Sequence, residues 1–252
     1  MAFTNNRASY CVVKTVAAIC LVAAVMAAHG AFAQGRVLKM GVTDFRPVAY
    51  MDESGVAQGI AVALVQHIAR ENGYSVEFVH DSWSSLVGLL KQGEIDILSM
   101  SYSREREAEF VFTDKGFMTN WGEVYTSPDA DLASLLDLRG LKVAVPKKGI
   151  FTNGPDGVIA LNDKFKLEME LVPSMSFGTI FDKVQSGEAD AGMVDRLFGA
   201  LNAREYKLEK TGILVSPVEL HLAFGKSLAD AGELQSLFSE GTELLIQDKQ
   251  SI

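Results

Sequence analysis

The sequence predicts an α/β protein of two similar Rossmann-like lobes, joined by a two-strand hinge with a ligand cleft between them. Three observations support this prediction. Strand-like and helix-like segments alternate from residue 37 onward, which is typical of a mostly parallel sheet covered by helices. One helix–glycine–strand unit occurs twice, and two short extended segments lie where the chain would pass between lobes.

The first half of the chain contains one alternating set of segments. Strands are expected at 37–42, 75–80 and 95–99, and helices at 59–71 and 84–91. The alternation resumes after residue 125, with strands at 142–145, 167–172 and 189–194, a helix at 177–185 and a helical tail at 228–247. Two alternating sets of this size predict two α/β lobes.

The repeated unit covers residues 83–96 and 177–190. Trp83 opens the first copy and Phe177 the second, and apolar residues follow three and seven positions later in both. Gly93 and Gly187 then end the helices, and we expect both in the left-handed conformation. Many helix–glycine–strand junctions look alike, but an ordered match over several positions favours two similar lobes.

The segments 125–128 and 215–217 are the expected crossovers between lobes. They divide the chain into lobe 1 (34–125), lobe 2 (126–215) and a return to lobe 1 (216–252). Two extended strands form a natural hinge. Because ligands of open parallel sheets bind beyond the carboxyl ends of the strands, the expected site is the cleft between the lobes.

The N-terminus predicts a secretory signal peptide, residues 1–33. Arg7 and Lys14 precede an apolar run, Val16–Ala28, and Ala31-Phe32-Ala33 supplies an A-x-A cleavage site. An uncleaved membrane anchor is the weaker interpretation, because a span needs about 20 apolar residues. The expected location of the mature chain is periplasmic.

Composition excludes several functions. Both cysteines, Cys11 and Cys20, lie in the expected signal peptide, which leaves no thiol for a disulfide, a metal or a nucleophile. A net charge of −9 argues against a nucleic-acid partner. His67, His80 and His221 are far apart in sequence, so no metal site is expected, and no motif indicates a cofactor or a catalytic centre.

Residues 99–106 are the clearest candidate binding segment, because they follow a strand and open a short helix. Ser99, Ser101 and Ser103 supply hydroxyl groups, and Arg106 follows one turn later. Arginine pairs with carboxylates through two charge-assisted hydrogen bonds, and hydroxyl and backbone N–H groups complete such a site. The alternative is that Ser103 only caps a helix and the arginine is solvated.

Four further residues are candidates in the same cleft. Asp195 follows a strand in the second half, where it could bind an ammonium group or cap the next helix. Phe45 and Trp83 could contact an apolar part of the ligand or pack in the core. Thr152 follows the strand at 142–145.

Several motifs together resemble the bacterial periplasmic solute-binding proteins of family 3, the polar amino-acid class. The most specific is Ser103-x-x-Arg106 followed by Phe110–Thr113; residues 93–96, 138–145 and 187–190 also match. The resemblance implies a type II periplasmic-binding fold. It also implies that Arg106, helped by Ser101 and Ser103, holds the ligand α-carboxylate, that Asp195 takes the α-amino group, and that Phe45 and Trp83 line the first lobe.

The chain departs from the family pattern at three places, one of which is a slightly short spacing between the preceding strand and Arg106. The family often has Gly-Ser/Thr-Thr after the strand at 142–145, and here only Thr152 could replace that hydroxyl. The aspartate that the family usually carries near residues 59–63 is absent. The expected ligand is therefore an amino acid or a related carboxylate, without a closer identity.

The resemblance implies a binding protein, not an enzyme, that acts by hinge closure. Its membrane partner would be the permease of an ABC transporter or a signalling receptor. Residues 195–202 and 216–220 look more like the sensor-domain branch, which suggests the input module of a longer receptor. The alternatives are a periplasmic enzyme of the prephenate or arogenate dehydratase type and a purely structural adaptor.

Overall fold

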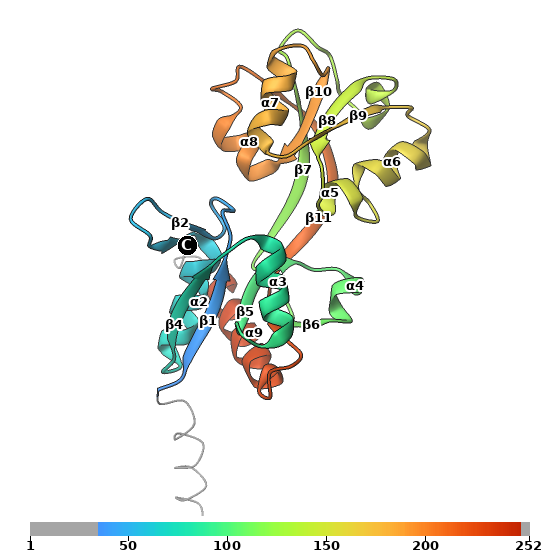
Figure 1. The fold of residues 1–252 in the computed structure, drawn as a ribbon. Coiled ribbons are helices and arrows are strands. Elements are labelled where there is room, and N and C mark those ends of the chain that lie inside the picture. Colours follow the sequence, from blue (N-terminus) through green and yellow to red (C-terminus); the bar gives the residue numbers. More distant parts are fainter. Residues whose placement is uncertain (1–34, 248–252) are drawn as a thin grey trace, which may run out of the picture.

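A computed structural model describes residues 35–247 and shows two lobes connected by two long strands (Figure 1). The strands β7 (Met118–Thr126) and β11 (Glu209–Gly225) run through both lobes. The expected signal peptide at 1–33 lies outside the described residues, as do residues 248–252. The remaining strands of the two lobes are β1 (Val37–Val42), β4 (Ser75–His80), β5 (Ile97–Ser101) and β6 (Phe110–Phe112) in the first, and β8 (Lys142–Pro146), β9 (Glu170–Ser174) and β10 (Ala191–Asp195) in the second.

One continuous sheet passes through both lobes in the order β4-β1-β5-β11-β7-β10-β8-β9, with β6 beside β11. Within each lobe the three strands away from the hinge are parallel to one another. The hinge strands β7 and β11 are antiparallel to their neighbours and to each other. The sheet is therefore mixed, because β11 runs against the parallel strands of the first lobe and β7 runs against those of the second.

Helices lie close to the four expected ranges, and further short helices cover both lobes. They are α2 (Ile60–Glu71), α3 (Trp83–Gln92), α4 (Arg104–Glu107), the 3-10 helix η1 (Leu135–Leu138), α5 (Ile150–Asn153), α6 (Val158–Phe165), α7 (Phe177–Gln185), α8 (Arg196–Asn202) and α9 (Ala231–Gln247). A small hairpin, β2 (Tyr50–Met51) with β3 (Ala57–Gln58), lies before α2. None of the described helices is long and apolar enough to cross a membrane.

The two helices of the sequence repeat begin and end in the same way. Ser82 caps α3 by accepting from the backbone N–H of Ser85, and Ser176 caps α7 by accepting from that of Thr179. Gly93 and Gly187 both have positive φ, 74° and 77°, which confirms the expected left-handed conformation after each helix. Each helix therefore stops where its glycine lets the chain turn into a buried strand.

Three strands begin later than the sequence suggested. The strand expected at 95–99 is β5, from Ile97 to Ser101, the one expected at 189–194 is β10, from Ala191 to Asp195, and the one expected at 167–172 is β9, from Glu170 to Ser174. Before β9, Lys166 and Glu168 have φ near 50°, a conformation that no strand contains. The chain is still turning at these residues, although Leu167 is fully buried.

In each lobe one aspartate and one lysine are joined by two hydrogen bonds that involve the lysine backbone, a contact that we call an aspartate bracket. In lobe 1 the backbone N–H of Lys39 donates to Asp96 Oδ2 at 2.7 Å, and the Asp96 N–H donates to the Lys39 carbonyl at 2.8 Å. In lobe 2 the N–H of Lys142 donates to Asp190 Oδ2 at 2.8 Å, and the Asp190 N–H donates to the Lys142 carbonyl at 2.9 Å. The internal repeat of the sequence is thus also a repeat of structure.

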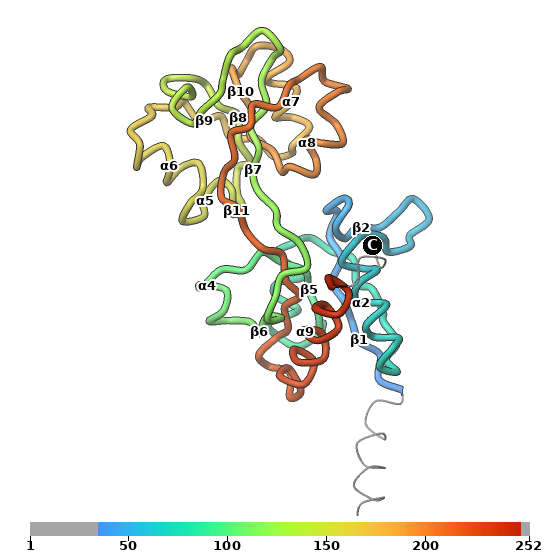
Figure 2. The backbone as a smooth tube through the Cα atoms, turned by 180° about the vertical axis from the view of Figure 1, so that it is seen from behind, coloured from blue at the N-terminus to red at the C-terminus, as the bar shows by residue number. Residues whose placement is uncertain are grey.

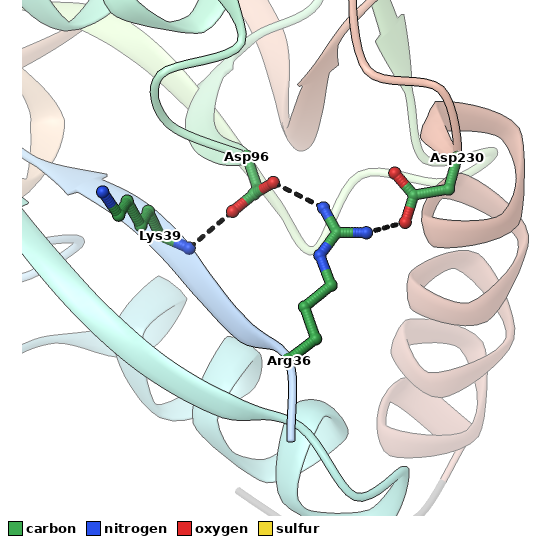
Figure 3. A network of polar contacts seen from close by, with 4 residues as sticks. All are labelled: Arg36, Lys39, Asp96 and Asp230. Atoms are coloured by element: carbon green, nitrogen blue, oxygen red, sulfur yellow. Dashed lines mark hydrogen bonds and ion pairs between the residues drawn. The ribbon is translucent and has the colours of Figure 1, made fainter. Parts of the chain in front are cut away.

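The C-terminal segment returns to lobe 1, where β11 leads into α9 beside the strands of that lobe (Figure 2). Arg36 pairs with Asp96, at 2.7 Å between Nη2 and Oδ1, and with Asp230, just before α9 (Figure 3). Gly241 of α9 lies against Ile68 of α2 so closely that a Cβ at residue 241 would come within 2.7 Å of that side chain. Helix α9 is therefore an integral part of lobe 1.

The packing of the hinge strands bears on where the two lobes divide. Val124 and Tyr125 pack in the hydrophobic clusters of lobe 2, which favours a first crossover within the earlier part of β7. The second crossover coincides with a register shift between Val215 and Val218 of β11, where Ser216 has a φ of 50°. We propose lobe boundaries inside β7 and β11, close to the divisions at 125 and 215 that the sequence suggested.

Candidate ligand-binding site

A cleft between the two lobes contains most of the candidate residues. Its inner part has a volume of about 310 Å³ and is lined from both sides. Of the eight candidates, seven line it: Phe45, Trp83, Ser99, Ser101, Arg106, Thr152 and Asp195. Residues that end β5, β8 and β10 meet here, which is the position expected for a ligand of parallel strands.

Arg106 enters the cleft from lobe 1 and is held by its own neighbours. Its Nη1 donates to the carbonyl oxygen of Ser101 at 2.7 Å and to Ser101 Oγ at 2.5 Å, and its guanidinium lies 5.6 Å from the centre of the Trp83 ring. Partial burial lowers its pKa, but an arginine stays charged at any physiological pH. No partner is found for Nη2 or Nε in the described part of the chain, so this edge can meet a carboxylate.

Ser103 has a different place from the other serines. It does not line the inner cleft, and its Oγ accepts from the backbone N–H of Arg106 at 3.3 Å, which caps α4. Ser99 and Ser101 lie two residues apart on β5 and so project from the same face of the sheet. Ser103 therefore caps the helix that carries Arg106, whereas Ser99 and Ser101 face the cleft.

Asp195 faces the cleft from lobe 2 and is 1% exposed. It caps α8, since Oδ1 accepts from the backbone N–H of Leu197 at 2.8 Å, while Oδ2 accepts from Asn120 Nδ2 at 2.5 Å. Burial raises the pKa of the Asp195 carboxyl, and these hydrogen bonds oppose the rise. The two interpretations made from the sequence, a helix cap and a cleft carboxylate, thus apply to the same side chain.

Sequence reasoning did not find Asn120, which also lines the inner cleft. It lies in hinge strand β7 and is 1% exposed, and its Oδ1 has no hydrogen-bond partner among the described residues. A buried amide with a free acceptor is unusual, because such groups are normally paired. A lone asparagine in the sequence gives no such signal; only its position opposite Asp195 does.

The two aromatic residues that open the repeated helices both reach the cleft. Trp83 lines its inner part from lobe 1 and is 40% exposed, and Phe177 lines it from lobe 2. Phe45, which follows β1, completes the apolar wall of lobe 1. The repeat thus places one ring from each lobe on the cleft, so the match of Trp83 with Phe177 does not make Trp83 a core residue.

Thr152 lies at the cleft but its hydroxyl proton is already used. Its Oγ1 donates to the carbonyl oxygen of Pro146 at 2.8 Å, and the side chain is buried. Gly149, with a φ of 136°, turns the chain into the four-residue helix α5 that carries Thr152. In this arrangement the hydroxyl can still accept a hydrogen bond, but it has no proton for a ligand carboxylate.

An outer part of the cleft, with a volume of about 700 Å³, continues from the inner part past Phe45 and Phe177. Its wall includes Met175, which is 82% exposed, and the basic residues Lys147 and Lys148. The cleft is thus open on one side to a ligand of variable length. Within the described residues, no group of three His, Cys, Asp or Glu side chains is placed to hold a metal ion.

Comparison with known proteins finds a family match in the first part of the chain. Residues 38–133 match the family model of the bacterial extracellular solute-binding proteins, family 3. The resemblance inferred from the sequence motifs is confirmed over these residues, which include Arg106 and its serines.

Curated relatives of the chain are binding proteins. The arginine-binding extracellular protein ArtP of Bacillus subtilis is 29% identical over 43% of this chain, a match that spans only 43% of ArtP. PatH of Vibrio harveyi, whose name describes an amino-acid ABC transporter-binding protein, is 29% identical over 79% of this chain and 73% of PatH. The names of both relatives describe proteins that bind amino acids.

Solved structures show that the fold is that of the type II periplasmic binding proteins, as expected. A histidine kinase sensor domain with similarity to these proteins superimposes with a TM-score of 0.69 at 26% identity, covering 87% of this chain and 93% of the domain. An ancestral arginine-binding protein superimposes with a TM-score of 0.67 at 21% identity, covering 85% of this chain and 94% of that protein, which supports the fold alone.

Proposed function

We propose that this protein binds a small zwitterionic ligand, an amino acid or a related carboxylate, by closing its two lobes around it. The observation that carries the proposal is that Arg106 from lobe 1 and Asp195 from lobe 2 face one cleft. A guanidinium with an unused edge and a buried carboxylate on opposite walls complement the two charges of an α-amino acid. Among the described residues, Asp195 is the one acidic side chain that lines the inner part of the cleft, and Lys148 is a second basic one beside Arg106.

Closure follows from the placement of these charges on different lobes. A ligand that touches both Arg106 and Asp195 binds the closed arrangement more tightly than the open one, and this difference shifts the population toward closure. A micromolar ligand would supply about 8 kcal/mol of binding free energy in total. The bend is expected in β7 and β11, the strands through which the chain passes between the lobes.

The output of closure is either uptake or signalling. A role in uptake, with the permease of an ABC transporter as partner, is supported by the similarity to PatH. A role as the sensor module of a membrane receptor is supported by the similarity to the histidine kinase sensor domain. The proposed cleft and hinge suit either output, because a permease and a receptor would both respond to the closed shape.

We infer that the protein is not an enzyme. The carboxylate of Glu123 is buried and accepts from the Tyr125 hydroxyl at 2.8 Å, and Lys210 Nζ lies 3.3 Å from it. Glu219 is mostly exposed and pairs with His221 outside the cleft. Asp195 is held by its cap and by Asn120, so none of these three carboxyl groups is placed to act as a general acid in the cleft. Turnover of prephenate-type acids by the purified protein would overturn this inference.

The site of action is proposed to be the periplasm. The family is described as extracellular, which agrees with a secretory signal peptide at residues 1–33. Mass spectrometry of the secreted protein provides the test. A mature N-terminus at Gln34 supports cleavage after Ala33, whereas an intact N-terminus in the membrane fraction contradicts it.

A thermal-shift screen tests the proposed function directly. The purified protein is melted with amino acids, with small carboxylates that lack an amine, and with amines that lack a carboxylate. A ligand at about 100 times its dissociation constant stabilises the folded state by about 2.7 kcal/mol, which raises the melting temperature by several degrees. Stabilisation confined to α-amino acids supports a zwitterion site, and no shift in any class contradicts the proposal.

A further inference from the structure

Three consecutive residues of hinge strand β7 contact Asp195 and Arg196 at the start of α8. Asn120 Nδ2 donates to Asp195 Oδ2 at 2.5 Å. On one side of it, the Thr119 carbonyl accepts from Arg196 Nη2 at 2.8 Å, and on the other the Arg196 guanidinium lies 4.3 Å from the centre of the Trp121 ring. Two adjacent residues of lobe 2 therefore hold three adjacent residues of the hinge.

Asn120 contributes more than a structural contact. The orientation of its amide is determined by Asp195, because the reverse orientation would set Oδ1 against a carboxylate oxygen. Its Oδ1 is consequently directed away from Asp195 and is buried without a hydrogen-bond partner in the described part of the chain. An ammonium group has three N–H donors, and two of the acceptor positions on Asp195 are already used.

We propose that Asn120 is a positioning residue for ammonium recognition, which fixes the Asp195 carboxylate toward the ligand and makes the hinge strand part of that contact. The inference rests on the proposed function, since it requires a ligand that carries an ammonium group. It goes further by assigning a role to a hinge residue that lies in neither lobe's binding segment. Asn120 then links occupancy of the site to the strand that must bend.

The other charges around Asp195 do not replace Asn120. Arg196 follows it on α8 but donates to Thr119 and stacks on Trp121. Glu123 and Tyr125 of β7 pair with each other, and Lys210 of β11 pairs with Glu123. Across the cleft, Arg106 is held by Ser101. Asn120 is therefore the one side chain among the described residues that hydrogen-bonds the Asp195 carboxylate.

Two substitutions test the role of the amide, and one provides the control. Asn120→Leu removes both amide atoms at similar volume, and Asn120→Ser removes them with a smaller polar side chain in case the first variant does not fold. Thr211→Val is the matched control, because Thr211 Oγ1 donates to the Val124 carbonyl at 3.0 Å and so also joins β11 to β7, away from the cleft. Circular dichroism and melting curves establish that each variant is folded.

The first measurement needs no ligand. The carboxyl carbon of Asp195 is titrated by nuclear magnetic resonance and assigned with the Asp195→Asn variant. The Asn120 hydrogen bond lowers the pKa of Asp195, so both Asn120 variants should titrate at a higher pH than the wild type, while Thr211→Val should not. An unchanged titration in both folded Asn120 variants would overturn the inference.

The second measurement uses calorimetry with the tightest binder among the common amino acids and with its α-hydroxy counterpart. The wild type should prefer the amino acid, and this preference should fall about tenfold or more in the Asn120 variants, with the hydroxy acid bound as before. A preference that is unchanged, in variants whose binding still depends on Arg106, overturns this inference alone. If no amino acid binds the wild type, the proposed function fails and this inference fails with it.

Discussion

Replacing Arg106 with alanine is the most direct test of the carboxylate site. The free edge of its guanidinium, Nη2 and Nε, can donate two charge-assisted hydrogen bonds, and each such bond contributes about 1.5–3 kcal/mol. Because the side chain is only half-buried and part of this energy is recovered from water, we expect a loss of about 2–4 kcal/mol. The dissociation constant should therefore rise about 30- to 700-fold.

Isothermal titration calorimetry with a carboxylate-bearing ligand from the thermal-shift screen measures this loss. Arg104→Ala is the matched control, since Arg104 is an exposed arginine of the same helix that does not line the cleft, and its affinity should stay within about twofold of wild type. Arg106→Lys keeps the charge without the planar fork and should lie between the two. If folded Arg106→Ala binds as tightly as Arg104→Ala, the assignment of Arg106 to the carboxylate is refuted.

Four further outcomes are expected. Asp195→Asn should weaken amine-bearing ligands far more than plain carboxylates in calorimetry; equal losses would leave Asp195 as a helix cap only. Burial raises the pKa of Asp195 in the folded protein above its value in the unfolded chain. As the pH falls through this raised pKa, the wild type should therefore gain stability relative to Asp195→Asn, measured by urea unfolding. A stability difference that does not change with pH would contradict the raised pKa. Gly199→Ala places a Cβ 2.4 Å from the buried Tyr125 ring and should cost about 1–3 kcal/mol in the same assay, whereas Gly88→Ala, in open space within α3, should be neutral or stabilising. Asp96→Ala leaves the Lys39 N–H and Arg36 without their shared partner and should lower the melting temperature by more than Ser54→Ala, at an exposed turn; equal melting temperatures would show that the bracket contributes nothing.

Much of the fold could be predicted from local pattern. The helix at 177–185 and the strands at 37–42 and 75–80 have the expected bounds, because their apolar spacing and their glycine or serine ends specify them without help from the rest of the chain. The start of β9 could not be predicted, since the positive φ of Lys166 and Glu168 arises from a turn that no glycine marks. The mixed character of the sheet also escaped prediction, because strand direction at the hinge depends on long-range pairing.

The candidate site was predictable where the chain itself brings residues together, and not where the fold does. Ser99, Ser101 and Arg106 lie within one strand–helix junction, so their proximity follows from sequence. Asn120 lies 75 residues from Asp195, and only the pairing of β7 with β10 places the two side chains in contact. The roles of these residues in binding remain predictions that the variants above are designed to test.

The paired aspartate brackets have a consequence for how such a molecule can change over evolution. Each bracket is closed by residues of its own lobe, so neither bracket depends on a contact between the lobes. In the proposed closure, the angle between the lobes changes at the two strands β7 and β11. A membrane partner that binds only the closed arrangement of the lobes would need no contact with the ligand. Residues of the cleft could therefore be exchanged for a new ligand while the same partner continued to receive the same signal.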